Sequence, residues 1–158
     1  MEFKNIEILS REVSILGNFL KANKSNPDWI KIVDYKKNTT KADYKIDALL
    51  KFILQKYVKD VPYYSEEVPH NIENRPEEYW LADPIDGTSS WAKGFEGYVI
   101  QAAYVLKNKP FFSFIYWPEK QRFYHCVRGK GSFLNLVKMT SSFNYKTPLK
   151  VVDNYPEP

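Results

Sequence analysis

The residues best suited to chemistry lie in the segment 83–88, which reads DPIDGT and follows a short apolar run. Pro84 cannot continue regular strand pairing, so we expect the chain to turn there. Such a turn directs the carboxylates of Asp83 and Asp86, together with the Ile85 carbonyl, into one cleft. Oxygen donors of this kind are the ligands that a hard cation such as Mg²⁺ prefers.

Gly87 and Thr88 complete this segment with features that suit an anion. Glycine lets the backbone approach a ligand closely, and a helical turn that begins at Thr88 would point free N–H groups at a phosphate. Metal ligands beside such N–H groups are typical of a site for a phosphate ester. The alternative is a plain surface turn, because Asp, Pro and Gly dominate turns.

A second acidic pair, Glu66 and Glu67, follows the short strand-like run 61–64 and offers a third carboxylate. The alternative is a solvated pair on the surface. We predict no catalytic or metal-binding role for His70, because a lone histidine in a loop is usually solvated. Cys126 is expected as a small core residue, because nothing near it suggests an activated thiol.

Two amphipathic helices are expected before these residues. A first helix is predicted because apolar residues recur at spacings of three and four, at Ile6, Leu9, Val13, Leu16 and Leu20. A second helix is predicted from about Lys41 to Tyr57. Thr39 and Thr40 are candidate N-caps for it, and Asp43 falls in its first turn, where negative charge is favoured.

The C-terminal part of the chain is typical of β-structure. Apolar runs at 98–106, 111–117 and 122–127 are separated by turn signals at 107–110 and 118–121. Together with the two helices, this order predicts an α+β fold. In it, two N-terminal helices pack on one face of a mostly antiparallel β-sheet.

The composition excludes several classes of protein. The 158 residues suit one domain, and 44% hydrophobic with 27% charged residues argues against disorder, collagen and coiled coil. The net charge of +4 is spread along the chain, so it predicts no nucleic-acid polymer as a partner. One cysteine, no secretory signal and no long apolar run lead us to expect a cytoplasmic chain with no membrane partner.

Residues 80–88, WLADPIDGT, resemble the W-x-x-D-P-x-D-G-T signature of the inositol monophosphatase superfamily. Its members are Mg²⁺-dependent, lithium-sensitive phosphomonoesterases. Three more segments resemble family motifs in the family's order: TKAD at 40–43, SEE at 65–67 and RGKGSF at 128–133. Four motifs in one order argue against coincidence.

The resemblance implies a metal site and the N-terminal domain of the sugar-phosphatase-like fold. Carried over by position, Glu66, Asp83 and Asp86 would be metal ligands, and the Ile85 carbonyl would join them. The implied cofactor is Mg²⁺.

The resemblance also implies how water and phosphate are held. Asp43 and Thr88 would form the pair that orients and activates the attacking water. Backbone N–H groups of Gly87 and Thr88 would bind the phosphate. The expected partner is therefore a small phosphorylated substrate, and a homodimer is left open.

Within the superfamily, residues 61–67, VPYYSEE, look most like the 3'(2'),5'-bisphosphate nucleotidases. That branch hydrolyses 3'-phosphoadenosine 5'-phosphate to AMP and phosphate. The alternatives are an inositol-1-monophosphatase and an inactive truncated fragment that binds metal without turnover.

The sequence departs from the family in three places. Residues 89–91 read SSW where relatives have Asn-Phe or Lys-Glu-Phe, and residues 36–39 lack the usual Ser-Pro. The W-D-x-A motif of the family's second domain has no counterpart. We therefore expect residues 1–158 to form the N-terminal metal-binding domain of such an enzyme, with the C-terminal domain absent.

Overall fold

The computed structural model describes residues 3–24, 26–34, 39–68 and 75–140. The helices of this part are α1 (Phe3–Ala22), α2 (Lys41–Gln55), α3 (Thr88–Ala92) and the 3-10 turn η1 (Pro118–Lys120). Its strands are β1 (Ile32–Asp34), β2 (Thr39–Thr40), β3 (Tyr63–Ser65), β4 (Glu78–Asp86), β5 (Val99–Leu106), β6 (Lys109–Trp117), β7 (Arg122–Val127), β8 (Gly131–Leu134) and β9 (Val137–Lys138).

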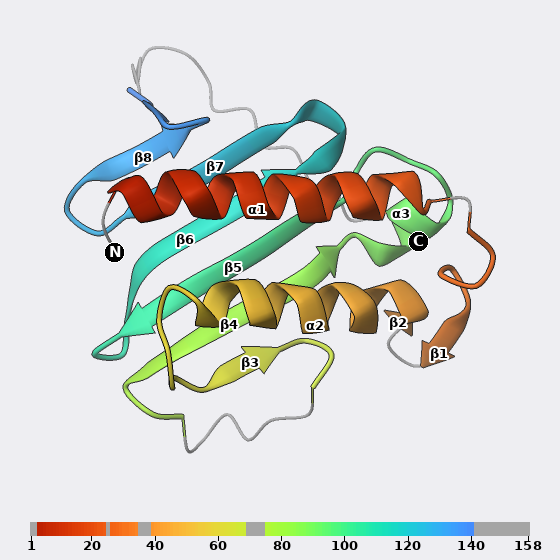
Figure 1. Ribbon diagram of the computed structural model, residues 1–158, viewed down its shortest axis with the longest axis horizontal. Coiled ribbons are helices and arrows are strands. Elements are labelled where there is room, and N and C mark those ends of the chain that lie inside the picture. The colour runs from red at the N-terminus through yellow and green to blue at the C-terminus, as the bar shows by residue number, and fades with distance from the viewer. Residues whose placement is uncertain (1–2, 25, 35–38, 69–74, 141–158) are drawn as a thin grey trace, which may run out of the picture.

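Seven strands form one sheet in the order β3-β4-β5-β6-β7-β8-β9. All neighbours pair antiparallel except β3 and β4, which are parallel. Helices α1 and α2 lie side by side, run in opposite directions and cover the same face of the sheet (Figure 1). This arrangement confirms the predicted α+β fold with two helices on a mostly antiparallel sheet. Within the described ranges, none of the helices is long and apolar enough to cross a membrane.

Helix α1 packs closely on the sheet through its predicted stripe. The side chains of that stripe are buried: Ile6, Leu9, Val13, Leu16 and Leu20. Gly17 permits the close approach, because a Cβ there would lie 2.3 Å from the ring of Tyr116 on β6. Ser14 Oγ is 3.1 Å from the Tyr116 hydroxyl, so the helix is also hydrogen-bonded to the strand.

Two sequence-based expectations are corrected by the strands. Strand β4 does not stop before Pro84 but continues to Asp86, with a shift in pairing register between Asp83 and Asp86. A bulge leaves one position unpaired, which accommodates a residue without an N–H group. Cys126 is exposed and not in the core, because strand alternation turns His125 and Val127 inward.

Glu119, in the 3-10 turn η1, links the end of α1 to the sheet. Its carboxylate accepts hydrogen bonds from Lys24 Nζ at 2.8 Å and from the Tyr98 hydroxyl at 2.9 Å, and Lys21 Nζ is 2.9 Å away. Burial acts to raise the pKa of Glu119. The hydrogen bonds from Lys24, Lys21 and Tyr98 outweigh that effect and lower the pKa to about 2. The folded state therefore favours the ionised carboxylate.

We expect Glu119→Gln to lower the free energy of unfolding at pH 7 by about 1–3 kcal/mol, because charge-assisted hydrogen bonds are lost from a side chain that is 8% exposed. A lowered folded pKa stabilises the protein above the unfolded pKa near 4.5, and this stability is lost as the pH falls toward 2. The difference in free energy of unfolding between the unsubstituted chain and Glu119→Gln should therefore shrink as the pH falls from about 4.5 to 2. Urea titrations at several pH values measure it.

The matched control is Glu96→Gln. Glu96 is paired with Lys120 at 2.6 Å, but its side chain is 61% exposed. Exposed pairs contribute about 0–1 kcal/mol. Equal losses for the two variants, or a Glu119 effect that does not change with pH, would contradict the account of this cluster.

Candidate functional site

The bulge in β4 places the two aspartates of the DPIDGT segment on one side of the sheet. Side chains three residues apart in a regular strand point to opposite faces. Here Asp83 pairs with Gln101 while Asp86 pairs with Val99, so β4 carries one residue more than β5 across this interval. Gln101 Nε2 consequently lies 2.9 Å from Asp86 Oδ2 and 3.4 Å from Asp83 Oδ2. The shared neighbour shows that both carboxylates face the same way.

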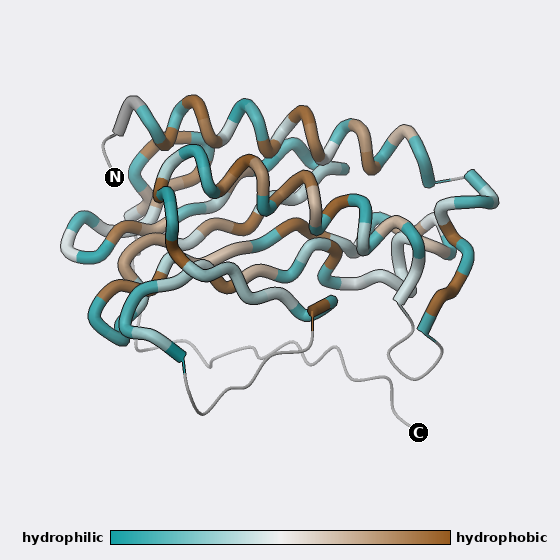
Figure 2. Tube along the Cα trace, turned by 60° about the horizontal axis from the view of Figure 1, so that its bottom comes forward, coloured by the Kyte–Doolittle hydropathy of each residue, from teal (hydrophilic) through white to brown (hydrophobic). Residues whose placement is uncertain are grey.

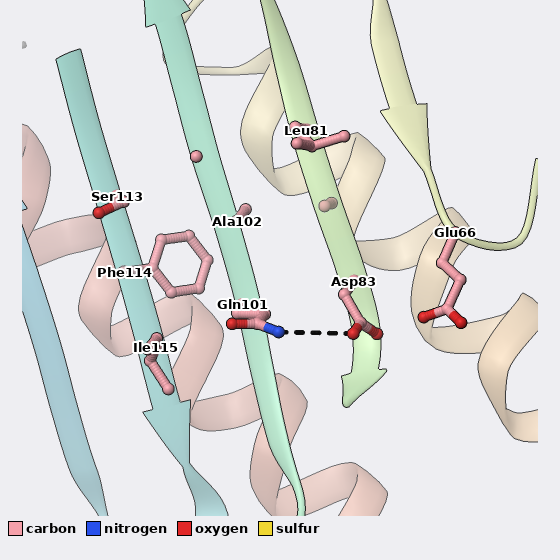
Figure 3. Close-up of a pocket in the computed structure, with 10 residues that line it drawn as sticks. Glu66, Leu81, Asp83, Gln101, Ala102, Ser113, Phe114 and Ile115 are labelled. Carbon is pink, nitrogen blue, oxygen red and sulfur yellow. Dashed lines mark hydrogen bonds between the residues drawn. The ribbon is translucent and has the colours of Figure 1, made fainter. Parts of the chain in front are cut away.

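Glu66 approaches this pair from the neighbouring strand. Parallel pairing sets Ser65 opposite Ala82, and the Glu66 N–H donates to the Ala82 carbonyl at 3.2 Å. Glu66 therefore stands beside the end of β4, and Figure 3 shows its carboxylate directed toward Asp83. The three carboxylates that the sequence singles out are gathered at one edge of the sheet.

The surroundings of Asp83 shift its pKa. Burial, followed by the negative charges of Glu66 and Asp86, raises the pKa of Asp83 to about 7. Its Oδ1 atom is buried and has no hydrogen-bond partner within the described ranges. A buried carboxylate oxygen that faces other acids is costly unless a cation or a donor satisfies it. The donor set therefore fits a hard cation.

The acids do not by themselves enclose a metal ion. Across residues 3–24, 26–34, 39–68 and 75–140, no group of three His, Cys, Asp or Glu side chains converges closely enough to form a metal cluster. Glu66 and Asp86 are near enough to Asp83 to disfavour its charged form, but the three side chains do not close a coordination shell. Backbone oxygen, water or substrate would have to complete the shell.

Asp43 and Thr88 are brought together from elements 45 residues apart in sequence. The Thr88 hydroxyl is 2.8 Å from Asp43 Oδ1 and 2.9 Å from the Ile85 carbonyl oxygen. Thr40 fixes the other carboxylate oxygen of Asp43, donating from its backbone N–H at 2.7 Å and from its hydroxyl at 2.6 Å. These bonds offset the cost of burying Asp43 completely.

This contact is a consequence of how α2 starts. Thr40 is the N-cap, and Thr40 with Asp43 forms a capping box in which each satisfies backbone N–H groups of the other. The cap holds Asp43 Oδ2, so Oδ1 is left to face Thr88. The predicted N-cap and the first-turn acid are therefore both present, and together they aim one carboxylate oxygen at the sheet edge.

Gly87 is required by the turn that joins β4 to α3. Its φ is +92°, a left-handed conformation, and a Cβ there would lie 2.5 Å from the Gly97 carbonyl oxygen. The turn is thus closed against the chain that leads into β5. Ile85, two residues before Gly87, is buried and holds this segment against the core.

A pocket of about 470 Å³ opens beside these acids on the sheet face away from α1 and α2. Its lining includes Glu66 and Asp83 at one end, and Leu81, Gln101, Ser113 and Ile115 along the strands (Figure 3). One end is therefore charged while the walls are largely apolar. Such a combination suits a ligand with an ionic group and a less polar body.

Gln101 is the residue that sequence reasoning missed. It lies in an ordinary β-run and belongs to no motif, so only the pairing of β4 with β5 shows that it faces both aspartates. His70 lies outside the described residues. His125 is buried between Phe133 and Phe123, and burial lowers its pKa, which is consistent with a structural role.

We expect Gly87→Ala to lower the free energy of unfolding by at least about 1 kcal/mol more than Gly94→Ala. Both glycines have positive φ, but an added Cβ at Gly94 meets nothing within 4 Å. The difference between the variants therefore isolates the clash with Gly97. Thermal or urea unfolding of both variants measures it, and equal losses would contradict a closed turn at Gly87.

Comparison with known sequences gives a family match. The model of the inositol monophosphatase family matches residues 4–155. Nus factor SuhB of Buchnera aphidicola subsp. Acyrthosiphon pisum is 31% identical over 150 residues, covering 90% of this chain and 56% of the relative. The 3'(2'),5'-bisphosphate nucleotidase CysQ of Haemophilus influenzae is 32% identical over 120 residues, which cover 71% of this chain and 45% of the relative. The chain thus spans about half the length of these curated relatives.

Solved structures show the same fold. The IMPase of Thermotoga maritima has a TM-score of 0.76 at 20% identity, covering 90% of this chain and 55% of that one. An IMPase/NADP phosphatase complexed with NADP and Ca²⁺ has a TM-score of 0.63 at 26% identity. The match covers 88% of this chain and 53% of that one. Because the family model spans nearly the whole sequence and relatives above 30% identity cover most of it, the chain belongs to the inositol monophosphatase family.

Proposed function

We propose that the chain carries the metal-dependent phosphomonoesterase chemistry of its family. The observation that carries this proposal is the contact between Thr88 and Asp43 at 2.8 Å, set beside a bulge that turns Asp83 and Asp86 to one side. A hydroxyl paired with a buried carboxylate is suited to handling the proton of a water molecule. Clustered acids beside it are suited to a cation.

Mg²⁺ is the proposed cofactor, and the unsatisfied Asp83 Oδ1 supports its fit to this site. Asp83, Asp86, Glu66 and the Ile85 carbonyl would hold it. When bound, the ion supplies a lowered pKa for a coordinated water and stabilises the charge that develops on the leaving oxygen. The relative solved with NADP and Ca²⁺ also binds a divalent ion together with a small phosphorylated molecule.

The Asp43–Thr88 pair would move the proton. Thr88 donates its hydroxyl proton toward Asp43 Oδ1, which leaves the lone pairs of Thr88 Oγ1 available to a water molecule. As the water oxygen bonds to phosphorus, the ester P–O bond breaks and the leaving oxygen takes a proton from solvent. One proton of the attacking water passes to Thr88 Oγ1, and the Thr88 proton passes to Asp43. The Thr40 hydrogen bonds keep Asp43 oriented throughout.

The phosphate would be held at the turn after β4. We propose that the backbone N–H groups of Gly87 and Thr88 contact its oxygens, since the turn begins α3 directly beside the acids. The rest of the substrate would lie along the pocket over β4, β5 and β6. Its apolar walls favour a substrate with a flat or weakly polar body.

For the substrate we propose a 3'(2'),5'-bisphosphate nucleotide, such as 3'-phosphoadenosine 5'-phosphate. The V-P-x-x-S-E-E pattern at 61–67 and the similarity to CysQ support this branch. Inositol 1-phosphate is the alternative substrate. A second candidate function is an N-terminal metal-binding domain without turnover of its own. The observation that supports this second candidate is that the acids among the described residues do not close a coordination shell.

The test is phosphate release by the purified chain, with and without Mg²⁺, from 3'-phosphoadenosine 5'-phosphate and inositol 1-phosphate. We expect Mg²⁺-dependent release, inhibited by lithium and faster with the nucleotide. Faster release from inositol 1-phosphate would overturn the substrate assignment. No release from either, in a folded chain that still binds Mg²⁺ by calorimetry, would favour the metal-binding domain.

Replacing Thr88 tests the proton-transfer pair. We expect Thr88→Val, which keeps the shape but removes the hydroxyl, to lower kcat by about 10²–10⁴-fold. Thr88→Ser retains the hydroxyl and should keep most of the activity. Steady-state kinetics would refute the role of Thr88 if the valine variant turned over at the rate of the serine variant.

Replacing Gln101 tests how the acids are positioned. We expect Gln101→Leu to weaken Mg²⁺ binding by about 10–100-fold, the range for outer groups that orient metal ligands. The reason is that Gln101 Nε2 holds Asp86 Oδ2 at 2.9 Å. Calorimetric titration measures the affinity without requiring turnover. Ser113→Ala, on the same sheet face, is the control, and equal affinities for the two variants would exclude a positioning role.

A further inference from the structure

An arginine and two tyrosines form a cluster beside the acids, at the β3 edge of the sheet. The guanidinium of Arg75 lies over the ring of Tyr64, 5.5 Å from its centroid, and over the ring of Tyr79 at 5.6 Å. The two rings meet edge to face, with their centroids 5.4 Å apart. We call these three residues the arginine–tyrosine cluster. Neither the proposed metal site nor the proton-transfer pair uses them.

Strand β3 turns Tyr64 to the same side of the sheet as Glu66. The Tyr63 hydroxyl donates to Asp47 Oδ1 on α2 at 2.7 Å, so Tyr63 faces the helix layer. Successive side chains of a strand alternate between its faces, and Tyr64 therefore faces away from the helices. Glu66 follows two residues later and points to the side of Tyr64.

Strand β4 places Tyr79 on that open face as well. Trp80 is opposite Tyr63 in the parallel ladder and is fully buried, so it faces the helix layer and Tyr79 faces outward. Leu81 is opposite Tyr64, and Asp83 follows Leu81 by two residues. The arginine–tyrosine cluster and the acids consequently occupy one face of the same two strands.

The separation between the cluster and the acids suits a ligand with two anionic groups. Two residues of strand separate Tyr64 from Glu66 and Leu81 from Asp83, which is about 7 Å along each strand. A ribose carries its 3'- and 5'-phosphates on opposite sides of one sugar ring, at a comparable separation. One phosphate can therefore lie at the acids while the other reaches the guanidinium above Tyr64.

Arg75 supplies the positive charge on this part of the sheet. Strands β3, β4 and β5 contain no lysine or arginine, and Arg75 lies three residues before β4 begins. Figure 2 turns this edge toward the viewer and shows hydrophilic residues in the chain that leads into β4. A guanidinium can donate two parallel hydrogen bonds to a phosphate, and stacking on aromatic rings fixes its plane before the ligand arrives.

We propose that Arg75 binds the second phosphate of a bisphosphate nucleotide and so selects it over a monophosphate. The 3'-phosphate lies at the acids, the 5'-phosphate accepts hydrogen bonds from Arg75, and the base extends into the pocket over β4, β5 and β6. Tyr64 and Tyr79 are positioning residues that hold the guanidinium. This inference rests on the proposed function, because that function places the reacting phosphate beside Asp83.

The test compares 3'-phosphoadenosine 5'-phosphate with adenosine 3'-phosphate, which lacks the 5'-phosphate. We expect Arg75→Gln to lower the ratio of kcat/KM for the bisphosphate to that for the monophosphate by about 10–100-fold, the effect of losing charge-assisted hydrogen bonds. The change should appear in the KM for the bisphosphate, because Arg75 contacts a group that does not react. Arg75→Lys keeps the charge without the planar fork and should retain part of the preference.

The matched control is Arg122→Gln, which removes one positive charge elsewhere on the sheet. Arg122 Nη1 also lies beside a tyrosine, 3.4 Å from the Tyr124 hydroxyl, but it belongs to β7, three strands from β4. Its replacement should leave the ratio unchanged. Equal changes for the two variants would show that net charge alone sets the preference, and would overturn the role of Arg75.

Equilibrium binding distinguishes a failure of this inference from a failure of the proposed function. Calorimetric titration of both nucleotides, with Ca²⁺ in place of Mg²⁺, measures the preference without requiring turnover. If the chain releases no phosphate but prefers the bisphosphate, and Arg75→Gln loses that preference, the inference stands and the phosphatase proposal falls. If turnover is normal and Arg75→Gln keeps the full preference, the inference alone is overturned and the cluster is structural. Binding of neither nucleotide overturns the inference as well.

Discussion

The pairing of β4 with β5 through a bulge between Asp83 and Asp86 is the constraint on which the site depends. In a regular strand the two carboxylates would lie on opposite faces, one in the core and one outside. The extra residue, placed where Pro84 cannot donate a ladder hydrogen bond, turns both to the open face. Gln101 on β5 can then reach both acids. A single register shift therefore brings two carboxylates of one strand to the same face of the sheet.

A second constraint joins the helix layer to this strand end. The capping box at the start of α2 uses one oxygen of Asp43 for Thr40 and leaves the other for Thr88. Capping interactions of this type contribute about 0.5–2 kcal/mol to stability. The same hydrogen bonds that start the helix thus also orient a buried carboxylate at the candidate site, so local stability and chemistry share the same atoms.

The site also lowers the stability of the folded chain, and the rest of the fold must offset that loss of free energy. Asp83 is partly buried beside two other acids, and that environment disfavours its charged form. The aromatic core between the sheet and the helices, together with the partly buried hydrogen bonds of Glu119 at the end of α1, supplies stability elsewhere. Carboxylates with perturbed pKa values cluster at functional sites. The helix layer also exposes apolar side chains on the side away from the sheet.

The fold class, both long helices, the order of the main strands and the family can be predicted from the amino-acid sequence alone. Regular periodicity reports which face of an element is buried, and motifs such as DPIDGT are local. Other features emerge only once the chain is folded. Strand β4 runs through Pro84, Cys126 faces outward and Gln101 meets two acids, because each depends on the register of a neighbouring strand. The contact between Asp43 and Thr88 likewise requires α2 to be packed on the sheet. Register and packing are pairwise properties of distant segments, and local spacing along a single chain does not encode them.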